Sequence, residues 1–298
     1  MKPVRKPIPV DLPVDTQRKL LLEPESNPTK YVPFQDARAF GFDPAATTHS
    51  RVNAWWLAEA SWLAYWHDKA AIGQVYRDRT GLDCELIDVK GAECTVASND
   101  RFAIVAFRGT QSGDWSDLLD DACFASVAWD AGHVHQGFAR RLSNITADLQ
   151  RVLARLAPSC RLWFTGHSLG AAAATLAAYR HRDRTDGICT FGSPLVGNGV
   201  FTGTFGGALG LKSTRYVNDH DLVTRVPPEP FALPHGLYTH VDHGRWINQD
   251  GQVGTTRPSV GHFVRDVFGR ALPDALSDHT PLYYVLHCWN DFALHFGE

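Results

Sequence analysis

The chain has few of the features that mark nucleic-acid-binding, metal-binding or membrane-spanning proteins. Its 29 Lys and Arg residues are outnumbered by 32 Asp and Glu, so there is no basic excess for a nucleic acid. The six cysteines occur neither in C-x-x-C pairs nor at the Cys/His spacing of a metal site, and we expect reduced thiols. No stretch is long and charge-free enough for a transmembrane helix.

The N-terminus lacks the apolar core of a signal peptide, because prolines and charged residues interrupt it. We therefore expect a cytoplasmic protein, with export by a leaderless route left open. Residues 1–45 are rich in proline and polar residues, which predicts an arm that is wrapped on the domain surface or is partly disordered. No linker or internal repeat divides the rest, so residues 46–298 are expected to form a single domain.

Apolar runs of strand and helix length alternate along this domain. We expect strands at 84–89, 93–97, 102–107, 187–191 and 214–217, and a helix at 138–156. This alternation predicts α/β layers around a mainly parallel sheet. The first two strands are joined by a hairpin turn at Lys90-Gly91, and a tight turn there would place Cys94 opposite Ile87 rather than opposite Cys84.

A cluster of tryptophans lies within residues 53–67. Trp55, Trp56, Trp62 and Trp66 recur there at helical spacing. A ligand surface is one interpretation, but an amphipathic helix that packs on the core is the better one.

The most informative motif is Gly166-His167-Ser168-Leu169-Gly170, between an apolar run and the alanine-rich run from Ala171. The pattern G-x-S-x-G between a strand and a helix indicates a nucleophile elbow, a tight turn that exposes a serine hydroxyl. Glycine is needed at both ends because a side chain there would collide with the neighbouring strand or helix. We therefore predict Ser168 as a nucleophile.

A serine nucleophile needs a histidine base and an acid, which follow it in the order Ser, Asp or Glu, His in α/β-hydrolases. Asp219 and Asp221 both lie in a loop after an expected strand, where such sheets place functional side chains. Sequence spacing does not choose between them. Nor does it choose among the later histidines, which are His235, His240, His243, His262, His279, His287 and His295.

The developing oxyanion needs backbone N–H donors. One is expected from Leu169, the residue after the nucleophile. The other is expected from Thr110, in the segment Phe107-Arg108-Gly109-Thr110 that ends an early strand.

Several motifs together resemble the class 3 lipases, the fungal triacylglycerol lipases and their bacterial and plant relatives. They cover roughly residues 80–285 in the family's order. The motifs are Phe107-Arg108-Gly109-Thr110, Asp114-Trp115 with Asp117-Leu118, Val134-His135-Gln136-Gly137-Phe138, Thr165 to Gly170, Thr190 to Asn198, Asp221-Leu222-Val223 with Pro227-Pro228, and Asp278-His279.

The resemblance implies an α/β-hydrolase fold and a serine esterase that works through an acyl-enzyme without metal or cofactor. It selects Asp221 as the acid and His279 as the base, with His240 as the runner-up. His135 matches a family motif but precedes Ser168 in the chain, so we interpret it as structural. Ala171 stands where a second glycine is usual, which should affect only helix packing.

Acylglycerols are the expected substrates of this esterase, with a phospholipase A1, an aromatic-ester esterase or a non-enzymatic binding protein as alternatives. Residues 111–134 are expected to form a lid that opens at a lipid surface, or an ordinary surface helix. Acyl-chain length and oligomeric state stay open.

Overall fold

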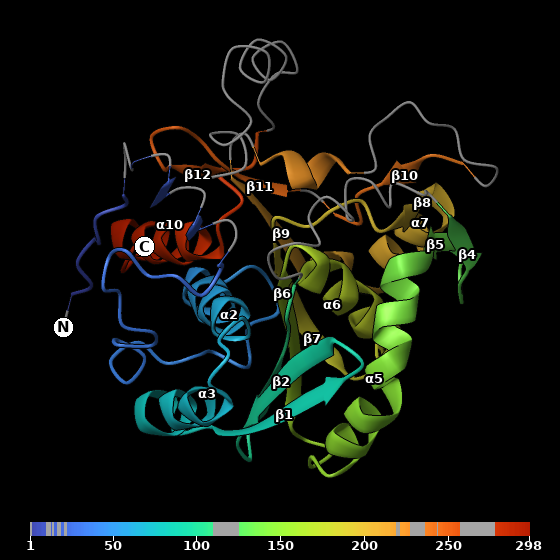
Figure 1. Ribbon diagram of the computed structural model, residues 1–298, viewed down its shortest axis with the longest axis horizontal. Helices are drawn as coiled ribbons and strands as arrows, with labels where there is room; N and C mark the ends of the chain where they lie inside the picture. Colours follow the sequence, from blue (N-terminus) through green and yellow to red (C-terminus); the bar gives the residue numbers. More distant parts are fainter. Residues whose placement is uncertain are drawn as a thin grey trace.

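The computed structural model describes residues 2–9, 13, 15–16, 19–20, 23–109, 125–218, 221–226, 236–242, 244–256 and 278–298. Its centre is an eight-stranded sheet in the order β1-β2-β3-β6-β7-β9-β11-β12 (Figure 1). The five strands from β3 to β11 run parallel, and antiparallel strands add to both ends. The strands are β1 (Asp83–Val89), β2 (Ala92–Ser98), β3 (Phe102–Phe107), β6 (Arg161–His167), β7 (Thr185–Phe191), β9 (Ser213–Asn218), β11 (Gly244–Ile247) and β12 (Val253–Gly254).

The hairpin between β1 and β2 has the turn that the sequence predicts. Lys90 and Gly91 both have positive φ, 50° and 75°, as the mirror-image two-residue turn requires. The turn sets the register, in which Ile87 lies opposite Cys94 and Cys84 lies opposite Ala97. Both cysteines are free thiols, as expected.

The central strands alternate their side chains between two cores. In β3, Ile104 and Ala106 belong to one hydrophobic cluster, and Val105 and Phe107 belong to the other. Both faces are therefore buried, which explains why this strand reads as a continuous apolar run. One face is covered by α2 (Arg51–Leu63) and α10 (Pro281–Leu294), and the other by α5 (Gln136–Ala154) and α6 (Leu169–Arg180), as Figure 1 shows.

A second, four-stranded sheet lies at one end of the molecule and was not predicted. Its strands are only two or three residues long and come from distant parts of the chain, in the order β10 (Tyr238–Thr239), β8 (Gly197–Asn198), β5 (His133–His135) and β4 (Ser126–Ala128). Strands β4 and β5 form the end of the expected lid segment, whose residues 111–124 lie outside the described ranges. The remaining elements are α3 (Lys69–Val75), the π-helical turn Tyr76–Thr80, α7 (Gly199–Leu209), and short 3-10 turns at Gly210–Lys212 and Leu222–Arg225.

Helix α2 is buried on nearly all sides rather than amphipathic. Eleven of its 13 residues are buried, because the described parts of the N-terminal arm cover the side that faces away from the sheet. Phe34 from the arm packs edge-on against Trp56 with ring centroids 5.2 Å apart. The tryptophans therefore serve the core, as the sequence interpretation favoured.

One carboxyl group is enclosed in this core. Glu59 of α2 is fully buried and accepts hydrogen bonds from Tyr31 Oη at 2.5 Å and from Trp55 Nε1 at 3.0 Å. Burial raises the pKa of Glu59 to about 7. No helix in the described ranges combines the length and the apolarity needed to cross a bilayer.

Candidate active site

Ser168 stands between β6 and α6, at the carboxyl edge of the parallel strands. Its φ of 59° and ψ of −130° lie outside the regions that side-chain-bearing residues favour. Its amide donates to Phe191 O at 3.0 Å, which ties the turn to the end of β7. The hydroxyl is fully buried and has no hydrogen-bond partner among the described residues. A strained turn and an unused hydroxyl are what a nucleophile elbow requires.

The two glycines of the motif are required by close backbone contacts. A Cβ at Gly166 would lie 2.3 Å from Gly170 O, within the first turn of α6. A Cβ at Gly170 would lie 2.2 Å from Phe107 O, at the end of β3. Both distances are far below van der Waals contact with backbone atoms. The glycines therefore let the helix start directly against the strands on either side of Ser168.

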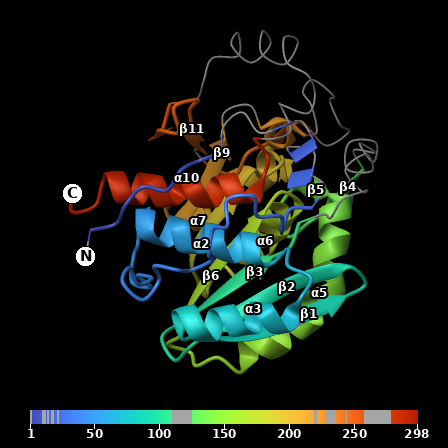
Figure 2. The same ribbon diagram turned by 60° about the vertical axis from the view of Figure 1, so that its left-hand side comes forward.

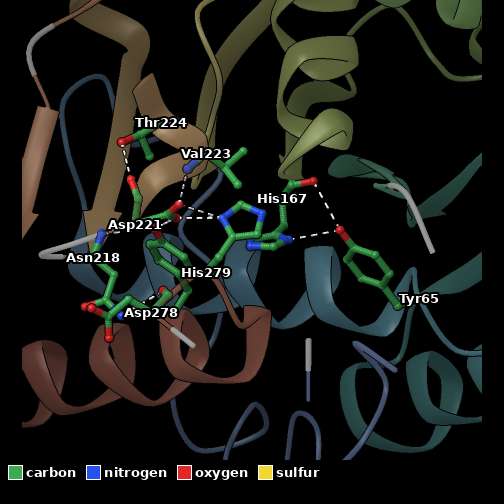
Figure 3. A network of polar contacts seen from close by, with 9 residues as sticks. Tyr65, His167, Asn218, Asp221, Val223, Thr224, Asp278 and His279 are labelled. Atoms are coloured by element: carbon green, nitrogen blue, oxygen red, sulfur yellow. Dashed lines mark hydrogen bonds and ion pairs between the residues drawn. The ribbon is translucent and has the colours of Figure 1, made fainter. Parts of the chain in front are cut away.

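Asp221 and His279 form a buried pair although 58 residues separate them. His279 Nδ1 donates to both carboxylate oxygens of Asp221, at 2.8 Å and 2.7 Å, and each residue is only 1% exposed (Figure 3). Gly192 lies against this pair, since a Cβ there would be 2.7 Å from Asp221 Oδ2 and 2.9 Å from His279 Nδ1. The pair thus adjoins the segment that follows Phe191, the residue that also anchors Ser168.

Two further donors hold the carboxylate of Asp221. Tyr284 Oη donates to Oδ2 at 2.6 Å and in turn accepts from Asn218 N at 3.0 Å. Val223 N donates to Oδ1 at 3.0 Å, in the 3-10 turn that follows the acid. Burial and the neighbouring Asp221 charge raise the pKa of Tyr284 well above its ordinary value, so its proton stays available for this bond. Sequence reasoning missed Tyr284, whose helical spacing alone marks it as a core residue.

A second buried tyrosine supports the elbow from the other side. Tyr65 follows α2, and its hydroxyl lies 2.9 Å from His167 Nδ1 and 3.3 Å from His167 O (Figure 3). A Cβ at Gly109 would be 2.0 Å from the same hydroxyl. Tyr65 therefore contacts both the elbow and the residue that precedes Thr110. Sequence reasoning missed it too, because nothing local distinguishes it from other aromatic residues of the tryptophan segment.

His167 lies beside the candidate base without competing with it for protons. The two imidazole ring centroids of His167 and His279 are 4.3 Å apart. Burial and the nearby His279 lower the pKa of His167 well below its ordinary value, so its ring is neutral at neutral pH. A neutral neighbour does not oppose the positive charge that a base acquires when it accepts a proton.

The other predicted residues are placed as follows. Leu169 is the first residue of α6, where helix geometry leaves its amide without an acceptor in the helix and available to an oxyanion. Thr110 and the alternative acid Asp219 lie outside the described residues. The runner-up base His240 contacts Thr224 O through Nε2 at 2.9 Å.

Three other histidines that the sequence analysis singled out lie within the described ranges. His287 is buried on α10, where burial lowers its pKa to about 4. His295 pairs with Asp291 at 3.1 Å. His135 begins α5 and accepts from Gly137 N at 3.1 Å, which is a capping role. Within the described ranges, no three His, Cys, Asp or Glu side chains are grouped as metal ligands would be.

A mainly parallel sheet with a serine elbow after one strand and an Asp–His pair after later elements is the arrangement of an α/β-hydrolase. The model of the family Lipase (class 3) matches residues 104–231, which include Ser168 and Asp221. Over this range, which is less than half of its length, the chain is similar to the class 3 lipases. The matched range ends before His279, whose place in the site comes from its contact with Asp221.

Individual relatives cover part of the chain. A lipase of Rhizomucor miehei is 28% identical over 166 residues, which are 51% of this chain and 43% of that protein. A chloroplastic phospholipase A(1) of Arabidopsis thaliana is 46% identical over 68 residues, 21% of this chain and 15% of that protein. The chain thus spans less than half the length of either relative.

The fold is shared more widely than the sequence. The crystal structure of a mono- and diacylglycerol lipase from Aspergillus oryzae superimposes with a TM-score of 0.61 at 21% identity, over 83% of this chain and 99% of that one. At this identity the likeness supports the α/β-hydrolase fold and no finer property.

Proposed function

We propose that this protein is a serine carboxylic-ester hydrolase, a lipase or esterase that acts on acylglycerols through an acyl-enzyme. The observation that carries the proposal is the buried Asp221–His279 pair, with bonds of 2.7 and 2.8 Å, beside the strained elbow of Ser168. A carboxylate, an imidazole and a serine hydroxyl are the three groups of a hydrolase triad.

In the proposed reaction, His279 takes the proton of the Ser168 hydroxyl as the serine oxygen attacks the ester carbonyl. Asp221 accepts a hydrogen bond from Nδ1–H, which fixes the tautomer with Nε2 as the base, and its charge stabilises the imidazolium. The Leu169 amide stabilises the oxyanion, and Thr110 is proposed as the second donor. The alcohol departs with the proton from His279, which then activates a water to release the acid and regenerate the serine.

Hydrolysis of p-nitrophenyl butyrate by the purified protein tests the proposal. Ser168→Ala should reduce kcat at least a thousandfold while leaving the urea midpoint nearly unchanged, because the hydroxyl has no described partner. His240→Ala, at the runner-up base, should retain far more activity than His279→Ala. Parental activity in Ser168→Ala would refute the assignment.

Phospholipid hydrolysis is the second candidate, supported by the short match to the plant phospholipase A(1). A chain-length series of acylglycerols run beside phosphatidylcholine vesicles separates the two. Preferential release of the sn-1 fatty acid from phosphatidylcholine would favour the second candidate.

A further inference from the structure

The beginning of the N-terminal arm is bound to the last helix of the protein. Trp289 Nε1 of α10 donates to Val4 O at 2.7 Å. Asn290 exchanges two hydrogen bonds with Lys6, since Lys6 N donates to its Oδ1 at 2.7 Å and its Nδ2 donates to Lys6 O at 2.8 Å. Figure 2 shows the arm running beside α10. These bonds fix the backbone of Lys6 beside α10 and so restrict where its side chain can reach.

The Lys6 ammonium lies in an enclosure of two aromatic rings and a carboxylate. Its Nζ is 4.4 Å from the ring centroid of Tyr31 and 4.4 Å from that of Trp289. The Asp36 carboxylate accepts from it at 2.7 Å. Both ring distances are within the range in which a cation is attracted to an aromatic face. The Lys6 side chain is only 18% exposed, so water screens these interactions incompletely.

The walls of this enclosure are fixed by contacts that do not involve Lys6. The Tyr31 hydroxyl donates to the buried Glu59 at 2.5 Å, which fixes the direction of the ring. Trp289 is 1% exposed and packs edge-on against Trp55, with ring centroids 4.7 Å apart. Loss of the Lys6 side chain would therefore leave the two faces in place and an opening between them.

The charges around the enclosure also favour a cation. The Asp36 carboxylate directly faces the ammonium. Glu59 lies behind Tyr31, and the attraction of Lys6 is one of the influences that lower the pKa of Glu59 against the larger effect of its burial. A positive group is thus matched by one direct carboxylate and by two electron-rich ring faces.

We propose that Tyr31, Trp289 and Asp36 form a binding site for a primary alkylammonium group, and that Lys6 occupies this site as an intramolecular ligand. The arm is then attached to α10 by a ligand–receptor contact in addition to backbone hydrogen bonds. The site is separate from the proposed ester hydrolysis and does not depend on it. When the Lys6 side chain is removed, a free alkylammonium ion should take its place.

Chemical rescue of the full-length Lys6→Ala variant tests the proposal. The variant should unfold about 4 °C below the parent protein, because it loses two cation–π contacts and a half-buried ion pair. Adding n-butylammonium chloride should raise the unfolding temperature of Lys6→Ala in a saturable way and recover at least half of that difference. The intrinsic tryptophan fluorescence should change with the same concentration dependence, because Trp289 forms one wall.

Matched controls isolate the ammonium group. Sodium chloride at equal concentration controls for ionic strength, and n-butanol controls for the apolar tail; neither should rescue the variant. The parent protein should not respond, because Lys6 fills the site. Lys2→Ala removes an exposed lysine of the same arm and should neither lower the unfolding temperature nor create a response. Adding Asp36→Asn to Lys6→Ala should weaken n-butylammonium binding about threefold.

Two results would overturn the proposal. One is a Lys6→Ala variant that n-butylammonium affects no more than it affects the parent protein. The other is an equal response with sodium chloride. If Lys6→Ala does not fold, Lys6→Gln keeps half of the methylene stem, and methylammonium is then the probe, judged by the same two criteria.

Discussion

The strained backbone at Ser168 leads to a prediction about stability, because one substitution there should remove activity and at the same time relieve strain. We expect Ser168→Gly to abolish ester hydrolysis and yet be more stable than Ser168→Ala. The φ of 59° with ψ of −130° is a conformation that glycine adopts freely and that a residue with a Cβ adopts only under strain. Ser168→Ala keeps the Cβ and therefore keeps the strain.

The magnitude follows from two opposing contributions. Relief of backbone strain at such a residue is worth roughly 1–3 kcal/mol. Against it, glycine in the unfolded chain has more conformational freedom, which costs about 0.5–1 kcal/mol. The net gain over Ser168→Ala is about 1 kcal/mol, or roughly 3 °C in Tm for a chain of this size. Loss of the hydroxyl is common to both variants and cancels from the comparison.

Urea unfolding of the parent protein and both variants, followed by circular dichroism, measures this difference. Ser143→Gly is a matched control, because Ser143 is exposed within α5 and should lose about 0.5–1 kcal/mol on the same change. The reasoning would be refuted by a Ser168→Gly variant that is less stable than Ser168→Ala by as much as the control.

Three further predictions concern the buried polar groups. Tyr284→Phe removes the 2.6 Å hydrogen bond to Asp221, and kcat/KM for p-nitrophenyl butyrate should therefore fall about 10- to 100-fold. Circular dichroism should show little change in fold, and unchanged kinetics would exclude a positioning role for Tyr284. Gly192→Ala places a methyl group 2.7 Å from Asp221 Oδ2 at a residue with a φ of 56°, so both kcat and Tm should drop. Parental values of both would show that the Asp221–His279 pair has room to shift. The free energy of unfolding of Glu59→Gln should rise relative to that of the parent protein, by up to about 3 kcal/mol, as pH increases from about 4.5 to 7. Unfolding curves recorded at several pH values measure this difference. The sign follows because the folded parent holds the Glu59 proton in this interval and the unfolded chain does not, and a pH-independent difference would contradict it.

Much of the fold follows from local sequence patterns. The strand at Phe102–Phe107 was predicted from its apolar run, and the hairpin register was predicted from two turn residues. The elbow was predicted from five consecutive residues, because its steric demands act between neighbours in the chain. The second sheet was not predictable in this way, since its strands of two or three residues carry too few side chains to show a period.

The candidate site also has one part that the local sequence predicts and one part that depends on contacts between distant residues. Ser168 and Leu169 follow from the local motif, whereas residue order alone left two aspartates and seven histidines open. The likeness to the lipase family chose Asp221 and His279, and the tertiary structure places these two in contact across 58 residues. No local pattern encodes that contact, because it arises where β9 and α10 pack at one edge of the sheet.

Sequence by itself determined the layered α/β fold and predicted a serine nucleophile at the elbow. Only the tertiary structure decided which aromatic residues have polar roles. Tyr284, Tyr65 and Tyr31 carry no local sign of a polar role in the sequence, yet each directs a hydroxyl to a partner from a distant element. The physical reason is that burial makes an unpaired hydroxyl costly, and the partner that satisfies it is fixed by packing rather than by sequence distance.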